Sequence, residues 1–278
     1  MAGYSTRQVP LSRRLVMDAT AISMHQPTVY GLFEVDVTEA RRLISDHRAT
    51  CGEAFSFTSF IVGCLARAVA LHPVVQGYLF RGRVIVFDEV DVVVIAEVPA
   101  GDFSFPLAHV VREAGNKPLR RIHDEVRRHQ SDTFRDHDHR WSPVRAFLWL
   151  PARIRRAIYG LLLRNPHRRK KYMGTVSVTA LGMYGDSQFW GIALPQHTLQ
   201  LVVGGISTKP AMVDGEVRPR ELLSLTLAVN HDVVDGGPAT RFANDLKHLI
   251  ETADGLAEAL QESTEQGPPA QHGRGRDR

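Results

Sequence analysis

The chain has 278 residues and is 44% hydrophobic, which is enough to bury a sizeable core, and nothing in it marks a second folding unit. We therefore expect one domain over residues 1–260 and a disordered tail over the polar, Gly/Pro-rich residues 261–278. No run of 18 apolar residues occurs and the N-terminus lacks a signal-peptide core, which argues against a membrane-spanning or secreted protein. Because Cys51 and Cys64 make no disulfide framework, a reducing, cytoplasmic location is expected.

The net charge of +4 conceals an uneven distribution. Residues 112–171 hold 17 Lys and Arg against 6 Asp and Glu, so the remainder of the chain is acidic. A basic region can bind nucleic acid, anionic lipid or a phosphate-bearing ligand, and composition does not choose among them. No recognised nucleic-acid motif accompanies this region, so nucleic acid is not expected as a partner.

The N-terminal half shows strand and helix patterns in turn. Tyr30–Ala40 predicts a strand that passes into a helix, which Asp36 or Thr38 would cap. Apolar residues at helical spacing predict a core helix over 56–71. Three β-branched or apolar runs predict strands, the first two paired as a hairpin: Val84–Phe87, Val90–Val98 and Phe105–Val111.

Three histidines, His129, His137 and His139, lie in or beside a polar stretch that follows a predicted helix over 117–128. Imidazoles that lie close together can bind zinc. However, His137 and His139 are two residues apart, no cysteine is near, and a solvated loop explains these residues equally well. We therefore predict no metal site.

Residues 142–164 combine apolar side chains, among them Phe147, Trp149, Ile154 and Ile158, with interspersed arginines. A basic amphipathic helix of this kind can lie on a membrane surface or form a lid over an apolar substrate. The alternative is a packed helix with a solvated basic face, kinked at Pro151. Four adjacent cations then follow, which suit a phosphate-bearing ligand or else form a solvated basic turn: Arg168, Arg169, Lys170 and Lys171.

The C-terminal half contains the most informative segment, Asn230–Gly237, which reads H-x-x-x-D-G from His231 onward. The alternating apolar run Glu221–Val229 before it predicts a strand, and helical spacing over 238–252 predicts a helix after it. His231 would therefore sit at the end of a buried strand, which is a rigid mount for a catalytic base. Further upstream, Gly174–Gly185 predicts a β-branched strand that closes on a glycine turn.

Three of these motifs, Tyr30–Ala40, Gly174–Gly185 and Asn230–Gly237, resemble in order and spacing the catalytic domain of 2-oxoacid dehydrogenase acyltransferases. They resemble chloramphenicol acetyltransferase and peptide-synthetase condensation domains more distantly. The resemblance covers residues 8–255 and is poor over 118–172. It implies an α/β (α+β) fold, a chloramphenicol acetyltransferase-like two-layer sandwich with a mixed sheet flanked by helices, in a homotrimer or a multiple of trimers. Because the chain begins almost at the catalytic domain, we expect a stand-alone form without a lipoyl domain or lipoyl group.

The resemblance also assigns catalytic roles. His231 matches the general base of the family. Asp235 matches the motif aspartate, which in the family holds the active-site backbone through a buried arginine. Arg14 is the matching arginine here, with Arg13 as a register alternative. Taken alone, His231 would be read as a strand-end histidine satisfied by backbone groups, and the three motifs together favour the catalytic role.

The hydroxyl that the family directs at the tetrahedral oxyanion falls on Thr179. Ser177, on the same face of the strand, is the fallback. Where the family usually has Asp-His-Arg, this chain has Asn230-His231-Asp232, a departure that bears on the usual acyl-carrier substrate more than on the chemistry.

The resemblance implies an acyltransferase that moves an acyl group from an acyl-coenzyme A or acyl-lipoyl thioester directly to a small-molecule or carrier acceptor, with no metal. Arg168, Arg169, Lys170 and Lys171 would hold the phosphates of coenzyme A. In the resembling family the histidine and the hydroxyl come from neighbouring subunits of a trimer. The alternative function is a non-catalytic or partner-dependent core subunit of a 2-oxoacid dehydrogenase-like assembly, and contact with a membrane surface through residues 142–164 is a further option.

Overall fold

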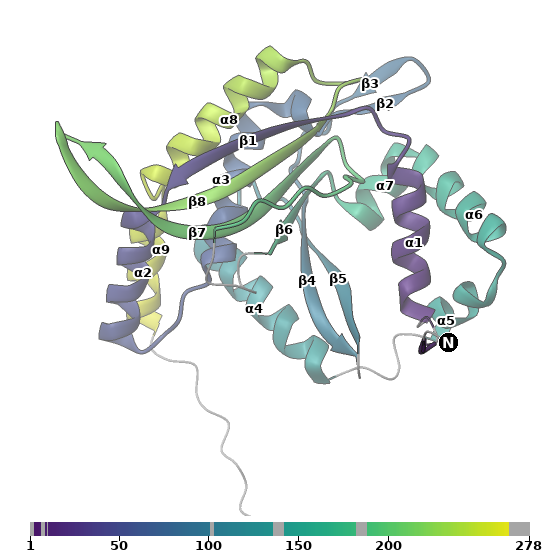
Figure 1. Ribbon diagram of the computed structural model, residues 1–278, viewed down its shortest axis with the longest axis horizontal. Coiled ribbons are helices and arrows are strands. Elements are labelled where there is room, and N and C mark those ends of the chain that lie inside the picture. Colours follow the sequence, from purple (N-terminus) through teal and green to yellow (C-terminus); the bar gives the residue numbers. More distant parts are fainter. Residues whose placement is uncertain are drawn as a thin grey trace, which may run out of the picture.

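The computed structural model describes residues 3–6, 9, 11–100, 103–135, 142–181 and 188–266. Its centre is a mixed six-stranded sheet in the order β1-β8-β7-β6-β4-β5 (Figure 1). The short strand β6 runs parallel to both β4 and β7, and the remaining neighbours are antiparallel. The strands are β1 (Thr28–Asp36), β4 (Val92–Ala100), β5 (Phe103–Val111), β6 (Val176–Ala180), β7 (Leu199–Val213) and β8 (Glu216–Asn230).

One group of helices covers the hydrophobic face of the sheet. These are α2 (Thr38–Cys51), α3 (Phe57–Leu71), α4 (Leu119–Arg135), α8 (Gly236–Glu251) and α9 (Leu256–Gln266). Helix α3 is apolar on almost every side and is therefore buried, with Phe60 and Leu65 fully inaccessible. Val92, Val94 and their neighbours on β6, Val176 and Val178, complete this core from the sheet.

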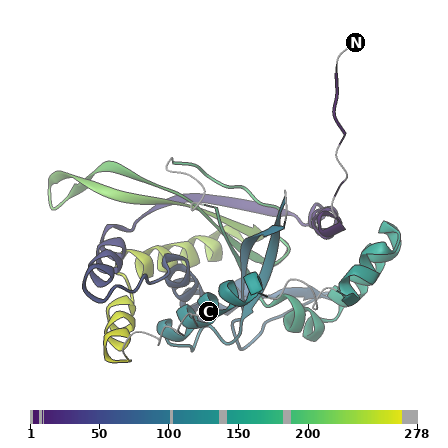
Figure 2. The same ribbon diagram turned by 90° about the horizontal axis from the view of Figure 1, so that it is seen from below.

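A second group of helices lies at the other end of the fold (Figure 1). It consists of α1 (Leu11–Ser23), α5 (Ser142–Trp149), α6 (Ala152–Arg164) and α7 (Pro166–Met173). The perpendicular view shows α1 well apart from the helices that cover the core (Figure 2). Because successive side chains of a strand alternate between faces, Val93 and Ser177 point away from the core, and both line a pocket that α1 also lines.

The structure corrects the predicted hairpin. The segment over 84–87 does not pair with the strand that follows it. Instead β3 (Arg83–Ile85) pairs with β2 (Tyr78–Phe80) in a separate two-stranded sheet, after the 3-10 turn Pro73–Gln76. Strand β4 belongs to the main sheet, where it lies between β5 and β6.

The end of the last helix also differs from the prediction. Helix α9 runs to Gln266, so residues 261–266 are helical and do not belong to the expected tail, whose remainder lies outside the described residues.

At the start of α2, the carboxylate of Asp36 accepts hydrogen bonds from the backbone N–H and the hydroxyl of Thr38, at 3.0 and 2.6 Å. The predicted glycine turn over 182–185 lies outside the described residues.

Candidate functional site

His231 follows the last residue of β8 and is held by its backbone. Its N–H donates to the carbonyl of Pro27 at 2.8 Å, which ties the turn to the start of β1. The preceding residue, Asn230, accepts from the N–H of Asp232 through its side chain at 2.9 Å. The imidazole itself is half exposed, and its Nδ1 lies 3.7 Å from Oδ1 of Asp235. His231 is therefore a fixed, solvent-accessible imidazole, as a general base must be.

The structure does not form the expected buried pair between Arg14 and Asp235. The side chain of Asp235 is 85% exposed at the N-terminus of α8, whereas Arg14 lies on α1 and donates to the carbonyl of Leu148 at 3.0 Å. The physical reason is the position of Arg14 near the N-terminal end of α1, a helix that contacts α5 and α6, whereas the C-terminal end of α1 leads into β1. Arg14 thus satisfies a carbonyl at the C-terminal end of α5 instead of the motif aspartate.

Thr179 and Ser177 lie on β6, on the face that points away from the core. Ser177 is 1% exposed, and its Oγ has no hydrogen-bond partner among the described residues. The hydroxyl of Thr179 accepts from the side-chain amide of Gln200 on β7 at 3.3 Å. Thr179 is less buried than Ser177, so its hydroxyl is the more accessible of the two to a substrate.

The sheet register separates Thr179 from His231. Thr179 lies opposite Val202 on β7, which lies opposite Thr226 on β8, and His231 follows five residues later. At about 3.4 Å per residue and about 4.8 Å per strand, the two are about 17 Å apart along the sheet and about 10 Å apart across it. A base and an oxyanion donor must each lie about 3 Å from the same reacting group. One chain therefore does not bring these two residues into a common site.

Sequence reasoning missed the polar character of this face of the sheet. Besides Ser177, the hydroxyls of Ser224 and Thr226 on β8 are buried without a hydrogen-bond partner in the described part of the chain. The sequence pattern that predicts a polar face is present in β8, where serine and threonine alternate with leucine. Since Leu223, Leu225 and Leu227 face the core, the alternating hydroxyls must face the same side as Thr179.

The structure does not gather the four cations of α7 into one cluster. The guanidinium of Arg169 is buried, lies 4.1 Å from the ring centroid of Tyr78 and donates to the carbonyl of Gln196. Lys170 pairs with Glu89. Arg168 and Lys171 are exposed and are left as candidates for contact with phosphate groups of a ligand.

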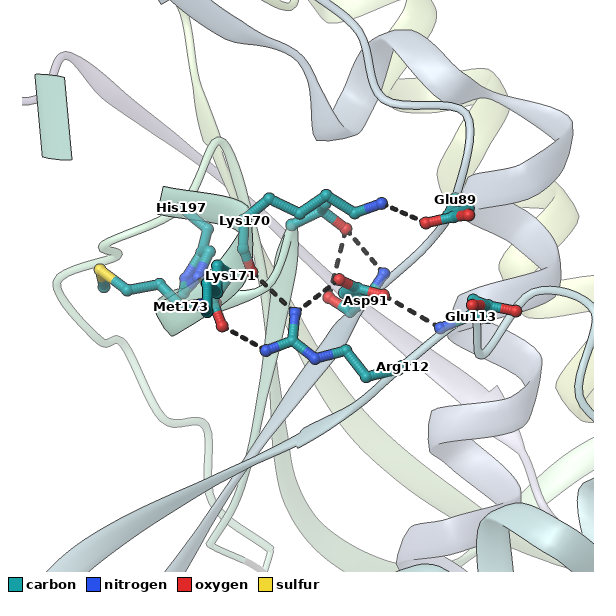
Figure 3. A network of polar contacts seen from close by, with 9 residues as sticks. Glu89, Asp91, Arg112, Glu113, Lys170, Lys171, Met173 and His197 are labelled. Atoms are coloured by element: carbon teal, nitrogen blue, oxygen red, sulfur yellow. Dashed lines mark hydrogen bonds and ion pairs between the residues drawn. The ribbon is translucent and has the colours of Figure 1, made fainter. Parts of the chain in front are cut away.

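A buried carboxylate fixes the C-terminal end of α7 (Figure 3). Asp91, at the start of β4, accepts from Arg112 at 2.7 Å and from the N–H of Glu113 at 3.0 Å. Arg112 also donates to the carbonyls of Lys170 and Lys171, which are unpaired backbone groups at the end of the helix. This network positions α7, and with it Arg169, relative to the sheet.

Helices α5 and α6 are separate helices joined at Pro151, where the packed-helix prediction placed a kink. Of the α6 arginines, Arg155 is buried and pairs with Asp18 of α1 at 2.6 Å, whereas Arg156 is half exposed and pairs with the same carboxylate at 3.0 Å. The apolar side chains form the exposed stripe of the helix: Ile154, Ile158, Leu161 and Leu162. Of the side chains expected to form a lid, Phe147 lines a pocket, whereas Trp149 is 71% exposed.

No group of three or more His, Cys, Asp and Glu suited to a metal ion occurs among the described residues. His129 stacks on His109, with ring centroids 4.2 Å apart, and His137 and His139 lie outside the described part of the chain.

His197 has a lowered pKa, because its burial disfavours the charged ring and brings the pKa to about 4. Its Nε2 donates to the carbonyl of Met173 at 2.6 Å, so the ring is neutral and structural. In the described residues no helix is long and apolar enough to cross a membrane.

Comparison with known sequences shows which family the C-terminal part of the chain resembles. Residues 167–258 match the family described as 2-oxoacid dehydrogenases acyltransferase (catalytic domain). The dihydrolipoyllysine-residue acetyltransferase component of the pyruvate dehydrogenase complex of Staphylococcus aureus is 23% identical over 252 residues, which are 88% of this chain and 51% of that protein. The chain thus spans about half the length of this curated relative.

Solved structures match over nearly the whole chain. A probable dihydrolipoamide acetyltransferase of Listeria monocytogenes superposes with a TM-score of 0.67 and 19% identity, covering 91% of this chain and 97% of that one. The cubic core of a pyruvate dehydrogenase multienzyme complex gives 0.64 and 20%, and dihydrolipoamide acetyltransferase of Azotobacter vinelandii gives 0.64 and 21%, each covering 92% and 94%. Chloramphenicol acetyltransferase gives 0.51 and 15%, covering 88% and 100%.

These likenesses define the class of the protein. The fold is the chloramphenicol acetyltransferase-like α/β fold, with a mixed six-stranded sheet flanked by helices, as the motifs predicted. Within this class, the chain is a distant relative of the catalytic domain of 2-oxoacid dehydrogenase acyltransferases, which confirms the resemblance carried by its motifs.

Proposed function

We propose that the protein is an acyltransferase that moves an acyl group from a coenzyme A or lipoyl thioester directly to an acceptor. The observation that carries this proposal is the placement of His231, an accessible imidazole whose backbone is fixed at the end of β8. Thr179, an accessible hydroxyl on the polar face of the same sheet, is the proposed partner. The family is one of acyltransferases, which supports the same reaction class.

The proposed reaction needs no nucleophile from the enzyme. The acceptor attacks the thioester carbonyl carbon while its proton passes to His231, and the carbonyl oxygen becomes negative. Because Nδ1 is the ring atom nearest Asp235, Nε2 is the atom that would accept the proton. The Thr179 hydroxyl would donate to the oxyanion. When the intermediate collapses, the carbon–sulfur bond breaks and the thiolate leaves, taking the proton back from His231.

The separation of about 20 Å between these two residues supports an assembly in which neighbouring subunits complete each site. His231 of one subunit would face Thr179 of the next in a closed ring, which we propose to be a trimer. One solved relative of similar fold is the cubic core of a pyruvate dehydrogenase complex. A monomer of this chain would then be inactive.

A relative accounts for the exposed Asp235. In the Azotobacter vinelandii enzyme a serine, a histidine and an asparagine have been investigated in the catalytic mechanism, and the histidine and asparagine are four positions apart. His231 and Asp235 have this spacing. An uncharged residue at that position forms no ion pair, so the absence of an Arg14–Asp235 pair is compatible with catalysis. We propose that Asp235 orients the His231 ring.

The exposed stripe of α6 supports a second activity, contact with an anionic membrane surface. Ile154 and Leu161 are 47% and 63% exposed, and Arg153 and Arg164 flank the stripe on its helix. Sedimentation with phosphatidylcholine vesicles, with and without phosphatidylglycerol, tests this proposal. Binding that requires phosphatidylglycerol and is lost in Leu161→Ser supports it, and equal behaviour of wild type and variant contradicts it.

The catalytic proposal is tested by the transfer of acetyl groups from acetyl-coenzyme A to dihydrolipoamide, followed by mass spectrometry of the products, with longer acyl-coenzyme A donors in parallel. His231→Ala should lower the rate by about 10²–10⁴, the usual contribution of a general base. His248→Ala, which removes an exposed histidine on α8, is the matched control and should leave the rate unchanged. Equal rates in the two variants would contradict the proposal. A wild-type protein that transfers no acyl group but binds other subunits of a 2-oxoacid dehydrogenase-like assembly would favour the alternative, a non-catalytic core subunit.

A further inference from the structure

Two adjoining pockets lie where α1, α6 and α7 meet the sheet, and the proposed reaction uses neither. The small pocket has a volume of about 240 Å³ and is lined by residues that include Ser23, Gln26, Arg164 and Arg169. The large pocket has a volume of about 630 Å³ and reaches Ser177 on the polar face of the sheet. Ala19, Tyr159 and Gln196 line both, so the pockets share one wall.

The small pocket contains a buried positive charge with no carboxylate to balance it. Arg169 is 7% exposed, burial lowers its pKa, and the groups that favour its charge are the side chains of Tyr78 and Tyr159, with no Asp or Glu of the described residues among them. Its contacts are the ring of Tyr78 and the carbonyl of Gln196, which are neutral groups. A buried guanidinium needs a counter-charge, because taking an unpaired ion out of water is costly.

Further polar groups in the wall of the small pocket also lack partners. In the described part of the chain, the Oγ of Ser23 and the Oε1 of Gln26 are buried without a hydrogen bond. Arg164, an exposed residue, also lines this pocket. Two arginines and a hydroxyl are donors of the kind that bind a carboxylate or a phosphate group, whereas the Oε1 of Gln26 is an acceptor and would need a donor such as a phosphate hydroxyl.

The large pocket has the opposite character. Its walls are mainly apolar, with Val93 and Ile95 from β4, Leu15 and Val16 from α1, and Phe147 from α5. Its volume falls in the range of sites for small molecules, which are apolar cavities with a few polar groups. The polar groups of its lining include the Asp18–Arg155 ion pair and Gln200, which donates to Thr179. An occupant of the large pocket would therefore extend from the small pocket toward the candidate catalytic hydroxyl.

The shared wall contains a hydrogen bond from the hydroxyl of Tyr159 to Oε1 of Gln196, of 2.9 Å. This bond is between two side chains of the shared wall, so an occupant that spans both pockets would have to displace it.

We propose that the two pockets together bind an elongated anionic amphiphile, with its carboxylate or phosphate group at Arg169 and Arg164 and its apolar chain in the large pocket. The inference does not rest on the proposed acyl transfer, because binding needs no proton transfer. It adds a ligand class to the chain whether that ligand is a substrate or an effector.

Equilibrium binding of dodecanoate and dodecyl phosphate to the full-length chain tests the proposal, with dodecanol and inorganic phosphate as the two halves of the ligand. At least one of the two amphiphiles should bind at least tenfold more tightly than either half. Shortening the chain from twelve to eight carbons should weaken binding about threefold to fourfold per CH₂ removed from water. Equal affinity for dodecanol and both anions, or a flat dependence on chain length, would overturn the proposal.

Single substitutions test the contribution of each pocket to binding. Arg169→Met should weaken binding of the anionic amphiphile at least tenfold and leave dodecanol unaffected, whereas Arg48→Met, an exposed arginine of α2 outside both pockets, should change neither. Because Arg169→Met removes a buried contact, Ala108→Leu serves as a second variant. Ala108 is exposed and lines the large pocket, so the larger side chain should reduce the dependence on chain length. Amphiphile binding should persist in His231→Ala, which separates this proposal from the catalytic one.

Discussion

The ion pair between Asp18 and Arg155 attaches α6 to α1, and its removal is a quantitative test of the observed arrangement. The two side chains are each 6% exposed and their closest atoms are 2.6 Å apart. Asp18→Asn leaves a buried guanidinium without its counter-charge, and breaking a buried pair in this way costs about 3–5 kcal/mol. Because Arg155 also donates to the carbonyl of Leu150, we expect a loss near 3 kcal/mol.

Arg156 provides an internal comparison on the same carboxylate. It lies 3.0 Å from the other oxygen of Asp18, but its side chain is 46% exposed. Solvent screens such a pair, so Arg156→Met should cost less than about 1 kcal/mol. The structure therefore predicts that two neighbouring arginines bound to one aspartate differ at least threefold in their contribution to stability.

Urea unfolding followed by circular dichroism measures both losses, and a double-mutant cycle of Asp18→Asn with Arg155→Met isolates their coupling. If α5 and α6 detach before the sheet unfolds, hydrogen exchange will show lost protection in those helices alone. Wild-type stability and wild-type protection in Asp18→Asn would refute the inward orientation of Arg155. Equal losses in Arg155→Met and Arg156→Met would refute the reasoning from burial.

Three further predictions concern stability. Because the folded chain holds the pKa of His197 at about 4 whereas an unfolded histidine titrates near 6.5, only the unfolded state gains a proton as the pH falls between these values. His197 alone should therefore lower the stability by about 3 kcal/mol over that window, and denaturant titrations of His197→Gln should lack this part of the slope. Gly204→Ala places a methyl group 2.4 Å from the carbonyl oxygen of Phe189, so a loss of about 1–3 kcal/mol is expected in urea titration, and an unchanged midpoint would contradict the close approach. Arg112→Met leaves buried Asp91 unpaired and frees the end of α7, so a drop in melting temperature of about 2–8 °C is expected, and wild-type melting would contradict the network of Figure 3.

The sequence predicted the elements whose patterns are local. Helical spacing over 56–71 corresponds to α3, and the alternation in Glu221–Val229 lies within β8. The pairing of the strands was not predicted correctly. Val84–Phe87 and Val90–Val98 looked like a hairpin, but β3 pairs with β2, which precedes it across Arg81 and Gly82, and β4 pairs with β5, which follows it. The partner of β4 on its other edge, the parallel strand β6, lies far along the chain, and no pattern within β4 records it.

The orientation of α6 could not be read from its sequence either. Amphipathic spacing places the apolar stripe toward the core by default, and the structure reverses this. The cause is Asp18, which is 137 residues from Arg155 and draws the arginine inward. The prediction that Arg14 pairs with Asp235 was wrong for a similar reason. The contacts of Arg14 depend on where α1 packs and not on the motif around Arg14 itself.

The elements predicted around two candidate residues are confirmed, since His231 follows directly on the end of β8 and Thr179 lies on β6. Their distance from each other could not be predicted from the motifs, because it follows from the order β8-β7-β6 and the register of those strands. In the proposed assembly, that order would place the two motifs in two different sites.

Mixed assemblies test this central claim most directly. Subunits carrying His231→Ala and subunits carrying Thr179→Ala would be co-expressed with different affinity tags, and assemblies containing both would be isolated by tandem purification. The rate of acetyl transfer from acetyl-coenzyme A to dihydrolipoamide would then be compared with each variant alone. If each site combines His231 of one subunit with Thr179 of its neighbour in a trimer, one of the three sites in every mixed ring is intact, and about one third of the wild-type rate should return. Mixed assemblies as inactive as the single variants would contradict a site shared between subunits.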